Sequence, residues 1–161
     1  MDFTIEAMAE TDAAAVLAIY ADGLATGLAT FETAVPPWDI WQQKHHASCR
    51  LVARSNAGVM GWAALSPVSL RPVYRGVAEV SIYIAKPARG QGVGKRLLQA
   101  LVTASETAGF WTLQASLFPE NRASLAIHIS NGFRIVGRRE RIAQLDGVWR
   151  DTLLLERRSK N

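Results

Sequence analysis

The sequence is poor in the features that secreted, membrane-spanning and metal-binding proteins require. It contains a single cysteine, Cys49, so an internal disulfide cannot form and nothing indicates an oxidising compartment. Its longest apolar stretches, such as residues 13–20, are much shorter than the roughly 20 residues that cross a bilayer. The first residues lack a basic segment followed by an apolar one, the mark of a signal peptide. We therefore expect a cytoplasmic protein with no membrane partner.

A metal site also lacks support. His45, His46 and Cys49 are neighbouring donors, but a zinc site needs a fourth ligand or a second cluster, and neither is evident. Cys49 has no evident base partner that would make it a nucleophile. We expect these side chains to belong to a helix surface and to the core, and we expect no metal.

The composition is that of one ordinary soluble domain. The 161 residues are 49% hydrophobic and 20% charged, and no repeat, low-complexity tract or long linker divides them. The net charge is +4, with much of the excess near the C-terminus. Such a surface attracts nucleic acid or an anionic small molecule alike, but no zinc-finger spacing or aromatic-laced RNA motif accompanies it. We expect a single domain over residues 1–161 that binds no nucleic acid.

The hydrophobic pattern predicts a mixed order of elements, β-α-α-β-β-β-α-β-α-β-β. Strands are expected at residues 3–7, 50–54, 59–66, 77–85, 111–118, 133–143 and 148–156. Helices are expected from residue 11 or 12, from residue 37, over 92–108 and over 121–130. This order indicates an α/β or α+β sheet with helices on both faces. We place Trp38, Trp41, Trp62 and Trp111 in its core, and the turn-rich residues 23–37 are a candidate active-site loop.

A glycine-rich turn, Arg89-Gly90-Gln91-Gly92-Val93-Gly94, joins the strand that ends near Ala85 to the most strongly patterned helix. Glycines let backbone N–H groups approach a ligand, and the N-terminus of the helix carries partial positive charge. Together they form an anion site suited to a pyrophosphate, to which Arg89 and Lys95 add charge. The spacing is neither a Walker motif nor a good Rossmann fingerprint, and the turn alone is equally consistent with close packing.

The surroundings of this turn make it more specific. Arg-x-x-Gly-x-Gly after a β-branched strand resembles the acetyl-CoA pyrophosphate loop of the GNAT superfamily of N-acetyltransferases. Further along, Asn121 opens a helix that closes with Gly132-Phe133, which resembles the second signature of that superfamily. The resemblance covers essentially the whole chain. It implies the GNAT fold, a central mixed, mostly antiparallel, splayed β-sheet with helices on both faces.

Finer details resemble one group, the phosphinothricin and methionine sulfoximine N-acetyltransferases. The matching segments are residues 29–33, 71–76, 78–84 and 147–151. The resemblance implies transfer of the acetyl group of acetyl-CoA to the α-amino group of a small amino-acid analogue. Analogues of the phosphinothricin, methionine sulfoximine and arsinothricin types fit, which implies a role in detoxification or resistance. A homodimer is also implied, with the Trp149 region of one chain near its neighbour's active site.

Within that resemblance Glu79 is the expected general base. A substrate amine is mostly protonated at neutral pH, and a carboxylate that accepts its proton, directly or through water, typically accelerates the reaction ~10²–10⁴-fold. From the residues alone, Glu79 is equally a solvated strand residue paired with Arg71 or Arg75. His128 stands where the superfamily often has a tyrosine that protonates the departing CoA thiolate. It either does that job or only contacts CoA.

The strand between Glu79 and the glycine turn has the length that the cofactor needs. Residues 79–84 span ~17 Å, comparable to an extended pantetheine arm, so a thioester anchored at the turn reaches back toward Glu79. The implied splaying of the sheet frees the N–H groups of Ile82 and Ile84. Asn121 is expected to bond the pantetheine, with a helix N-cap as the alternative. The expected cofactor contacts are Ile82, Tyr83, Ile84, Arg89, Gly90, Gln91, Gly92, Val93, Gly94, Lys95, Asn121 and Ser124.

Two arginines precede the Glu79 strand. Arg71 and Arg75 suit a substrate with a carboxylate and a polar head group, because a guanidinium binds such anions with paired hydrogen bonds. Most surface arginines are simply solvated, which is the alternative. Phe31, Glu32 and Trp149 complete the expected substrate pocket, although a loop aromatic is as often part of the core.

Two other functions stay open. The first is acetylation of a protein N-terminus, a polyamine or an aminoglycoside, but cationic substrates favour an acidic pocket and the arginine pair argues against them. The second is a non-catalytic acyl-CoA sensor or a basic nucleic-acid-binding domain. The presence of Glu79 beside an intact pyrophosphate turn argues against that one.

Overall fold

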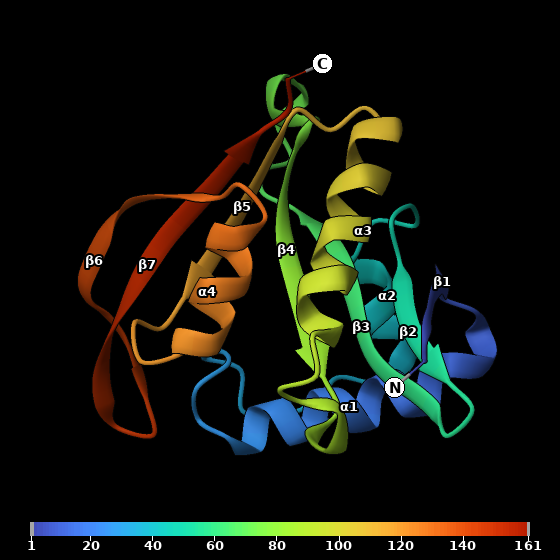
Figure 1. The fold of residues 1–161 in the computed structure, drawn as a ribbon. Coiled ribbons are helices and arrows are strands. Elements are labelled where there is room, and N and C mark those ends of the chain that lie inside the picture. Colours follow the sequence, from blue (N-terminus) through green and yellow to red (C-terminus); the bar gives the residue numbers. More distant parts are fainter. Residues whose placement is uncertain (1, 161) are drawn as a thin grey trace.

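A seven-stranded sheet with the order β1-β2-β3-β4-β5-β7-β6 runs through the computed structural model, which describes residues 2–160 (Figure 1). The strands are β1 (Thr4–Ala7), β2 (Leu51–Ser55), β3 (Gly58–Pro67), β4 (Val77–Ile84), β5 (Thr112–Leu117), β6 (Arg134–Leu145) and β7 (Val148–Arg158). All neighbouring pairs are antiparallel except β4 and β5. A helix joins that parallel pair, because parallel strands need a crossover connection.

Helices cover both faces of the sheet, as Figure 1 shows. They are α1 (Ala13–Ala25), α2 (Trp38–Lys44), α3 (Val93–Thr107) and α4 (Arg122–Ser130). Side chains alternate along β3, so Ala63 and Leu65 join the core beneath α3. Trp62 and Ala64 point the other way and pack against α1 and α2. The sheet therefore separates two cores.

The helix α3 is the crossover between the two parallel strands, and its sequence explains its position. Leu97, Leu98 and Leu101 are fully buried, and their spacing places them on one stripe of the helix. Gly109, whose φ of 91° favours glycine, follows the C-terminus of α3 and lets the chain turn into β5. At its other end α3 begins directly after Gly92, so the glycine turn is held against the end of β4.

The predicted order of strands and helices is confirmed, as is a mixed, mostly antiparallel sheet with helices on both faces. Placing Trp111 in the core was wrong, because this side chain is 38% exposed and lies under the Arg75 guanidinium at 5.4 Å. The helix α1 continues through Gly23, where a Cβ would come within 2.5 Å of the Tyr83 ring. Within residues 2–160, none of the helices has the length and apolar character that a membrane crossing needs.

Candidate active site

The parallel strands β4 and β5 separate after three residues. Their ladder runs from Val77 opposite Thr112 to Glu79 opposite Gln114, whereas β4 stays paired with β3 as far as Ile84. Ala85 donates its N–H to Met60 on β3, and successive N–H groups of a strand alternate in direction. The N–H groups of Ile82 and Ile84 therefore face the gap toward β5. An extended ligand can bond to such an open strand edge.

The glycine turn stands at the end of this open edge. Gly90 and Gly92 have φ values of 76° and 80°, a conformation that side chains strongly disfavour. Gly94 lies against α4, where a Cβ would come within 2.7 Å of the Ile127 side chain. The first N–H groups of α3 have no partner within the helix, so they and the helix dipole suit an anion. Arg89 is held over the turn by a hydrogen bond from Nε to the Ile84 carbonyl at 3.2 Å.

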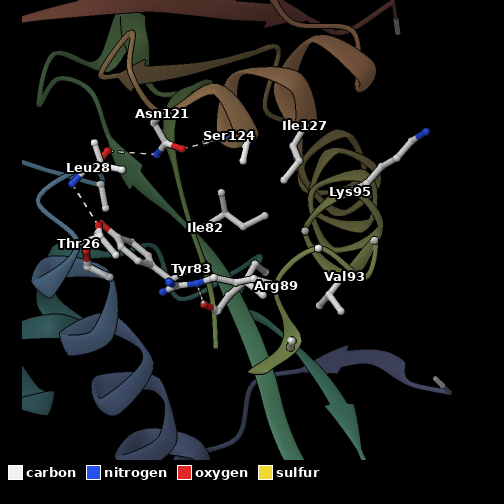
Figure 2. Close-up of a pocket in the computed structure, with 18 residues that line it drawn as sticks. Thr26, Leu28, Ile82, Tyr83, Arg89, Val93, Lys95, Asn121, Ser124 and Ile127 are labelled. Atoms are coloured by element: carbon white, nitrogen blue, oxygen red, sulfur yellow. Dashed lines mark hydrogen bonds between the residues drawn. The ribbon is translucent and has the colours of Figure 1, made fainter. Parts of the chain in front are cut away.

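A cavity of about 520 Å³ connects the open edge to the turn, which is a usual size for a cofactor site (Figure 2). Strand β4, the glycine turn, the start of α4 and residues 26–29 after α1 form its walls. It is lined by all of the residues expected to contact the cofactor except Gln91. The Gln91 side chain instead donates to the Pro87 carbonyl at 2.8 Å, which braces the turn from outside.

A second, smaller cavity of about 120 Å³ lies against the first and shares Ala29, Ile82, Tyr83, Asn121 and Ser124 with it. Glu79 and His128, which are far apart in the sequence, both line this second cavity. Glu79 is half-buried and accepts one hydrogen bond, from Gln114 Nε2 at 3.2 Å. The two cavities, which share these five lining residues and are together called the cleft, thus place the glycine turn and the Glu79 carboxylate on adjoining sites.

His128 is almost completely buried, with 1% of its surface exposed. Its Nδ1 lies 2.7 Å from the Ser124 carbonyl, which can only accept, so the ring proton is assigned to Nδ1. Burial lowers the pKa of His128 below its usual 6.5, although this hydrogen bond opposes the shift. The ring is therefore neutral near pH 7, and Nε2 carries a lone pair with no protein partner among residues 2–160. To protonate a thiolate from Nε2, His128 must first accept a proton there.

Comparison with known proteins shows the family of this chain. The model of the acetyltransferase (GNAT) family matches residues 16–133, which is most of the chain. The chain belongs to this family. Phosphinothricin N-acetyltransferase of Alcaligenes faecalis is 35% identical, over 96% of this chain and 81% of that protein. The L-methionine sulfoximine/L-methionine sulfone acetyltransferase of Pseudomonas paraeruginosa is 29% identical, over 97% and 94%.

A solved GNAT structure supports both the fold and the cofactor. The phosphinothricin acetyltransferase of Sinorhizobium meliloti in complex with acetyl-CoA is 29% identical to this chain. It superposes with a TM-score of 0.89, covering 98% of this chain and 89% of that one. The expected GNAT fold and the assignment as an N-acetyltransferase are thereby confirmed.

In this acetyltransferase Asn121 has two structural partners. Its Oδ1 accepts from the Ser124 N–H at 3.3 Å and caps α4, while its Nδ2 donates to the Leu28 carbonyl at 3.2 Å (Figure 2). Asn121 thus links α4 by hydrogen bonds to residues 26–30, the segment after α1 that lines both cavities. The N-cap alternative is therefore present, together with a link to Leu28 that the sequence did not reveal.

The residues expected to bind substrate are not gathered in the cleft. Arg71 and Arg75 are exposed, line neither cavity, and lie over the rings of Tyr74 and Trp111 at 5.5 and 5.4 Å. Trp149 is 49% exposed on β7. Two expected pocket residues, Phe31 and Glu32, follow the cavity-lining Thr30, and the Phe31 ring packs edge-on against Phe118 at 4.9 Å.

The candidate active-site loop, residues 23–37, lines both cavities, although sequence reasoning did not single out the residues of the loop that do so. Thr26, Leu28 and Ala29 line the larger cavity, and Ala29 and Thr30 line the smaller one. All lie within residues 23–37, whose turn-rich composition was the available signal. The described residues also contain no cluster of three or more histidine, cysteine or acidic side chains that could hold a metal ion.

Proposed function

We propose that this N-acetyltransferase moves the acetyl group of acetyl-CoA to the α-amino group of a small amino-acid analogue. Analogues of the phosphinothricin, methionine sulfoximine and arsinothricin types are the proposed substrates, with detoxification in the cytoplasm as the role. The observation that carries the proposal is the pair of adjoining cavities, of which the larger is lined by the glycine turn and the smaller by Glu79. The substrates named for the similar proteins support the same class.

The residues of the larger cavity fit acetyl-CoA, which supplies an acetyl group activated as a thioester. Backbone N–H groups at Gly92 and Gly94, with Arg89 and Lys95 nearby, suit the pyrophosphate. The open edge of β4 offers N–H groups at Ile82 and Ile84 to the extended arm. Hydrogen-bond donors directed at a developing oxyanion usually make the largest contribution to catalysis. The N–H groups of this strand edge therefore have the proposed role of stabilising the oxyanion as well as binding the cofactor.

Glu79 has the proposed role of general base. Its carboxylate takes a proton from the substrate ammonium, directly or through water, and leaves a neutral amine with a free lone pair. The amine attacks the thioester carbon, and its nitrogen must then lose a second proton as the CoA thiolate leaves. Neutral His128 lines the same cavity, and its Nε2 can accept that proton and give it to the thiolate. The volume of this cavity, about 120 Å³, favours a small acceptor over a protein N-terminus.

The test of the base is Glu79→Gln, which keeps the side-chain shape but removes the basic carboxylate. Turnover is expected to fall by ~10²-fold or more, and the remaining activity to rise with pH as more amine arrives deprotonated. The affinity for acetyl-CoA, measured by calorimetry, stays unchanged because Glu79 does not line the larger cavity. Normal turnover across the pH range rules out Glu79 as the base.

The substrate class is tested by thiol release from acetyl-CoA with a panel of amino acids, their sulfoximine and phosphinic analogues, peptides and polyamines. Turnover confined to small amino-acid analogues supports the proposal. Preference for peptides or polyamines moves the enzyme to another acceptor class. Tight CoA binding without turnover on any amine makes the protein an acyl-CoA sensor.

A homodimer is the proposed assembly. The long β6–β7 hairpin exposes Ile142, Val148 and Trp149, which are apolar enough to suit contact with a second chain. Such a contact is the proposed route by which the Trp149 region reaches a neighbouring active site. Sedimentation at assay concentration should show a dimer, and a fully active monomer removes this part of the proposal.

A further inference from the structure

A hydrogen bond between the strands β4 and β5 lies beside the smaller cavity. Glu79 and Gln114 face each other at the last rung of the β4–β5 ladder, and the strands diverge beyond it. Gln114 Nε2 donates to Glu79 Oε1 over 3.2 Å. Among residues 2–160 this is the one hydrogen bond to the Glu79 carboxylate, and no arginine or lysine forms an ion pair with it.

The fold fixes the direction of the Gln114 side chain. Its neighbours in β5, Leu113 and Ala115, are buried in the α3 core, so Gln114 points to the opposite face with Glu79. On its other side Gln114 is in register with Glu156 of β7. Oε1 of Glu156 accepts from Arg134 and Arg158, at 2.7 and 3.0 Å, and Gln114 forms no hydrogen bond with this residue in the described structure. The amide is thus available to Glu79.

Glu79 is bound by a neutral amide and not by a charged guanidinium, which has a consequence for catalysis. An arginine tends to bind both oxygens of a carboxylate, whereas a single amide N–H engages one and leaves the other free to take a proton. A free glutamate side chain also samples several rotamers, and proton transfer requires an approach within hydrogen-bond distance, about 2.6–3.2 Å. A hydrogen bond from the Gln114 amide to Oε1 restricts the rotamers of Glu79 and lowers the basicity of its carboxylate little.

We propose that Gln114 is a positioning residue, which holds the Glu79 carboxylate so that Oε2 is presented to the acceptor amine. This proposal rests on the proposed role of Glu79 as the base. The other polar side chains near Glu79 are that of Ser66, its partner on β3, and those that line the small cavity with it, namely Thr30, Ser81, Tyr83, Ser116, Asn121, Ser124 and His128. None of these donates to its carboxylate in the described structure, so orientation rests on Gln114.

The first test is Gln114→Met, which has a similar length and shape but no donor. Because a misplaced catalytic group costs up to ~10²-fold, we expect kcat to fall roughly 10-fold. The KM for acetyl-CoA and the thermal unfolding midpoint stay at the wild-type values. Gln43→Met is the matched control, since Gln43 is an exposed glutamine on α2 away from both cavities, and it should change nothing.

A double-mutant cycle decides whether the effect passes through Glu79. In a Glu79→Gln background, Gln114→Met is expected to change kcat less than about twofold, because no base remains to be positioned. The exchanged pair, Glu79→Gln with Gln114→Glu, retains an amide facing a carboxylate across the rung. It should unfold like the wild type yet stay as slow as Glu79→Gln.

The outcomes separate this proposal from the one on which it rests. Wild-type kcat in Gln114→Met overturns the positioning role, as does an equal loss in both backgrounds. A loss accompanied by a lowered unfolding midpoint or a raised KM for acetyl-CoA reduces Gln114 to a structural residue. Normal turnover of Glu79→Gln alone instead overturns the general base itself.

Discussion

Arg150 and Gly27 are joined across 123 positions of the chain, with Arg150 Nη1 donating to the Gly27 carbonyl at 3.0 Å. The guanidinium also lies 3.4 Å from Glu120 and 4.0 Å from the centre of the Phe118 ring. The side chain of Arg150 is only 16% exposed. Through these contacts β7 holds the segment after α1, which encloses both cavities, against the turn that leads into α4.

Arg150→Met is therefore expected to loosen that segment without touching either cavity directly. Loss of a charged hydrogen bond costs about 1.5–3 kcal/mol, so kcat/KM for the amine should fall roughly 10-fold or more. Backbone hydrogen exchange should rise over residues 26–31. Arg139→Met, an exposed arginine on β6, is the control and should leave both measurements unchanged. Unaltered exchange over residues 26–31 in Arg150→Met would show that Arg150 does not hold the segment.

Gly92→Val tests the anion-binding turn. A valine at φ 80° is strained, and its Cβ branch projects where the backbone is proposed to meet the pyrophosphate. The KM for acetyl-CoA is expected to rise at least 10-fold with the fold retained. Steady-state kinetics and calorimetric titration with CoA provide the measurement.

The chain offers a matched control for that strain. Gly109 has a φ of 91°, also with open space around it, but it lies at the far end of α3. Gly109→Val should lower the unfolding midpoint much as Gly92→Val does, while leaving the KM for acetyl-CoA unchanged. If both variants bind CoA like the wild type, the turn is not the pyrophosphate site.

Sequence patterns predicted the elements well because their signals are local. The glycine turn, the stripe of leucines in α3 and the Asp146-Gly147 pair, which forms the turn between β6 and β7, can each be recognised within a few residues of sequence. The partner of Glu79 was not predictable in this way. Arg71 and Arg75 are close to Glu79 in sequence, yet the structure pairs Glu79 with Gln114, which depends on the register between strands 35 residues apart.

The same limit applies to His128 and Asn121. Their positions in the α4 segment were predicted, but the proton on His128 Nδ1 follows from a carbonyl of the preceding turn, and its neutral state follows from burial. The link from Asn121 to Leu28 spans 93 positions. Trp111 was predicted to be buried because it is apolar. Apolar character alone does not reveal that this residue lies at the edge of the core, just before β5 begins.

Arg71→Ala tests the predicted carboxylate clamp. If Arg71 binds the substrate carboxylate, the KM for an amino-acid analogue should rise by the equivalent of about 1.5–3 kcal/mol, roughly 10-fold or more. An amidated analogue lacks that anion and should be affected little. Kinetics with the two substrates side by side are the measurement. An equal rise in KM for both substrates, or no rise for either, excludes Arg71 as the carboxylate clamp. The exposed position of Arg71 would account for that result.

Asp12 and Arg54 give a prediction about stability against pH. Asp12 is 4% exposed, and it accepts hydrogen bonds from Arg54 Nη2 at 2.9 Å and from the Ala9 N–H at 2.9 Å. Burial alone would raise the pKa of Asp12, but these two donors outweigh it and hold the pKa below 3.8. A lowered pKa in the folded state stabilises the fold above the unfolded pKa, and that stability disappears as the pH falls through the folded value.

Asp12→Asn is therefore expected to lower the free energy of unfolding by about 2 kcal/mol at neutral pH, measured by urea unfolding. The difference from the wild type should shrink when the pH is lowered below 3.8, because the wild-type carboxylate is then progressively protonated as well. Glu6→Gln removes the more exposed partner of Arg54, at 3.1 Å, and should cost less than about 1 kcal/mol. A difference between Asp12→Asn and the wild type that stays constant from pH 7 to pH 2 would mean that the charge of Asp12 contributes nothing, and that its hydrogen bonds to Ala9 and Arg54 act through shape alone.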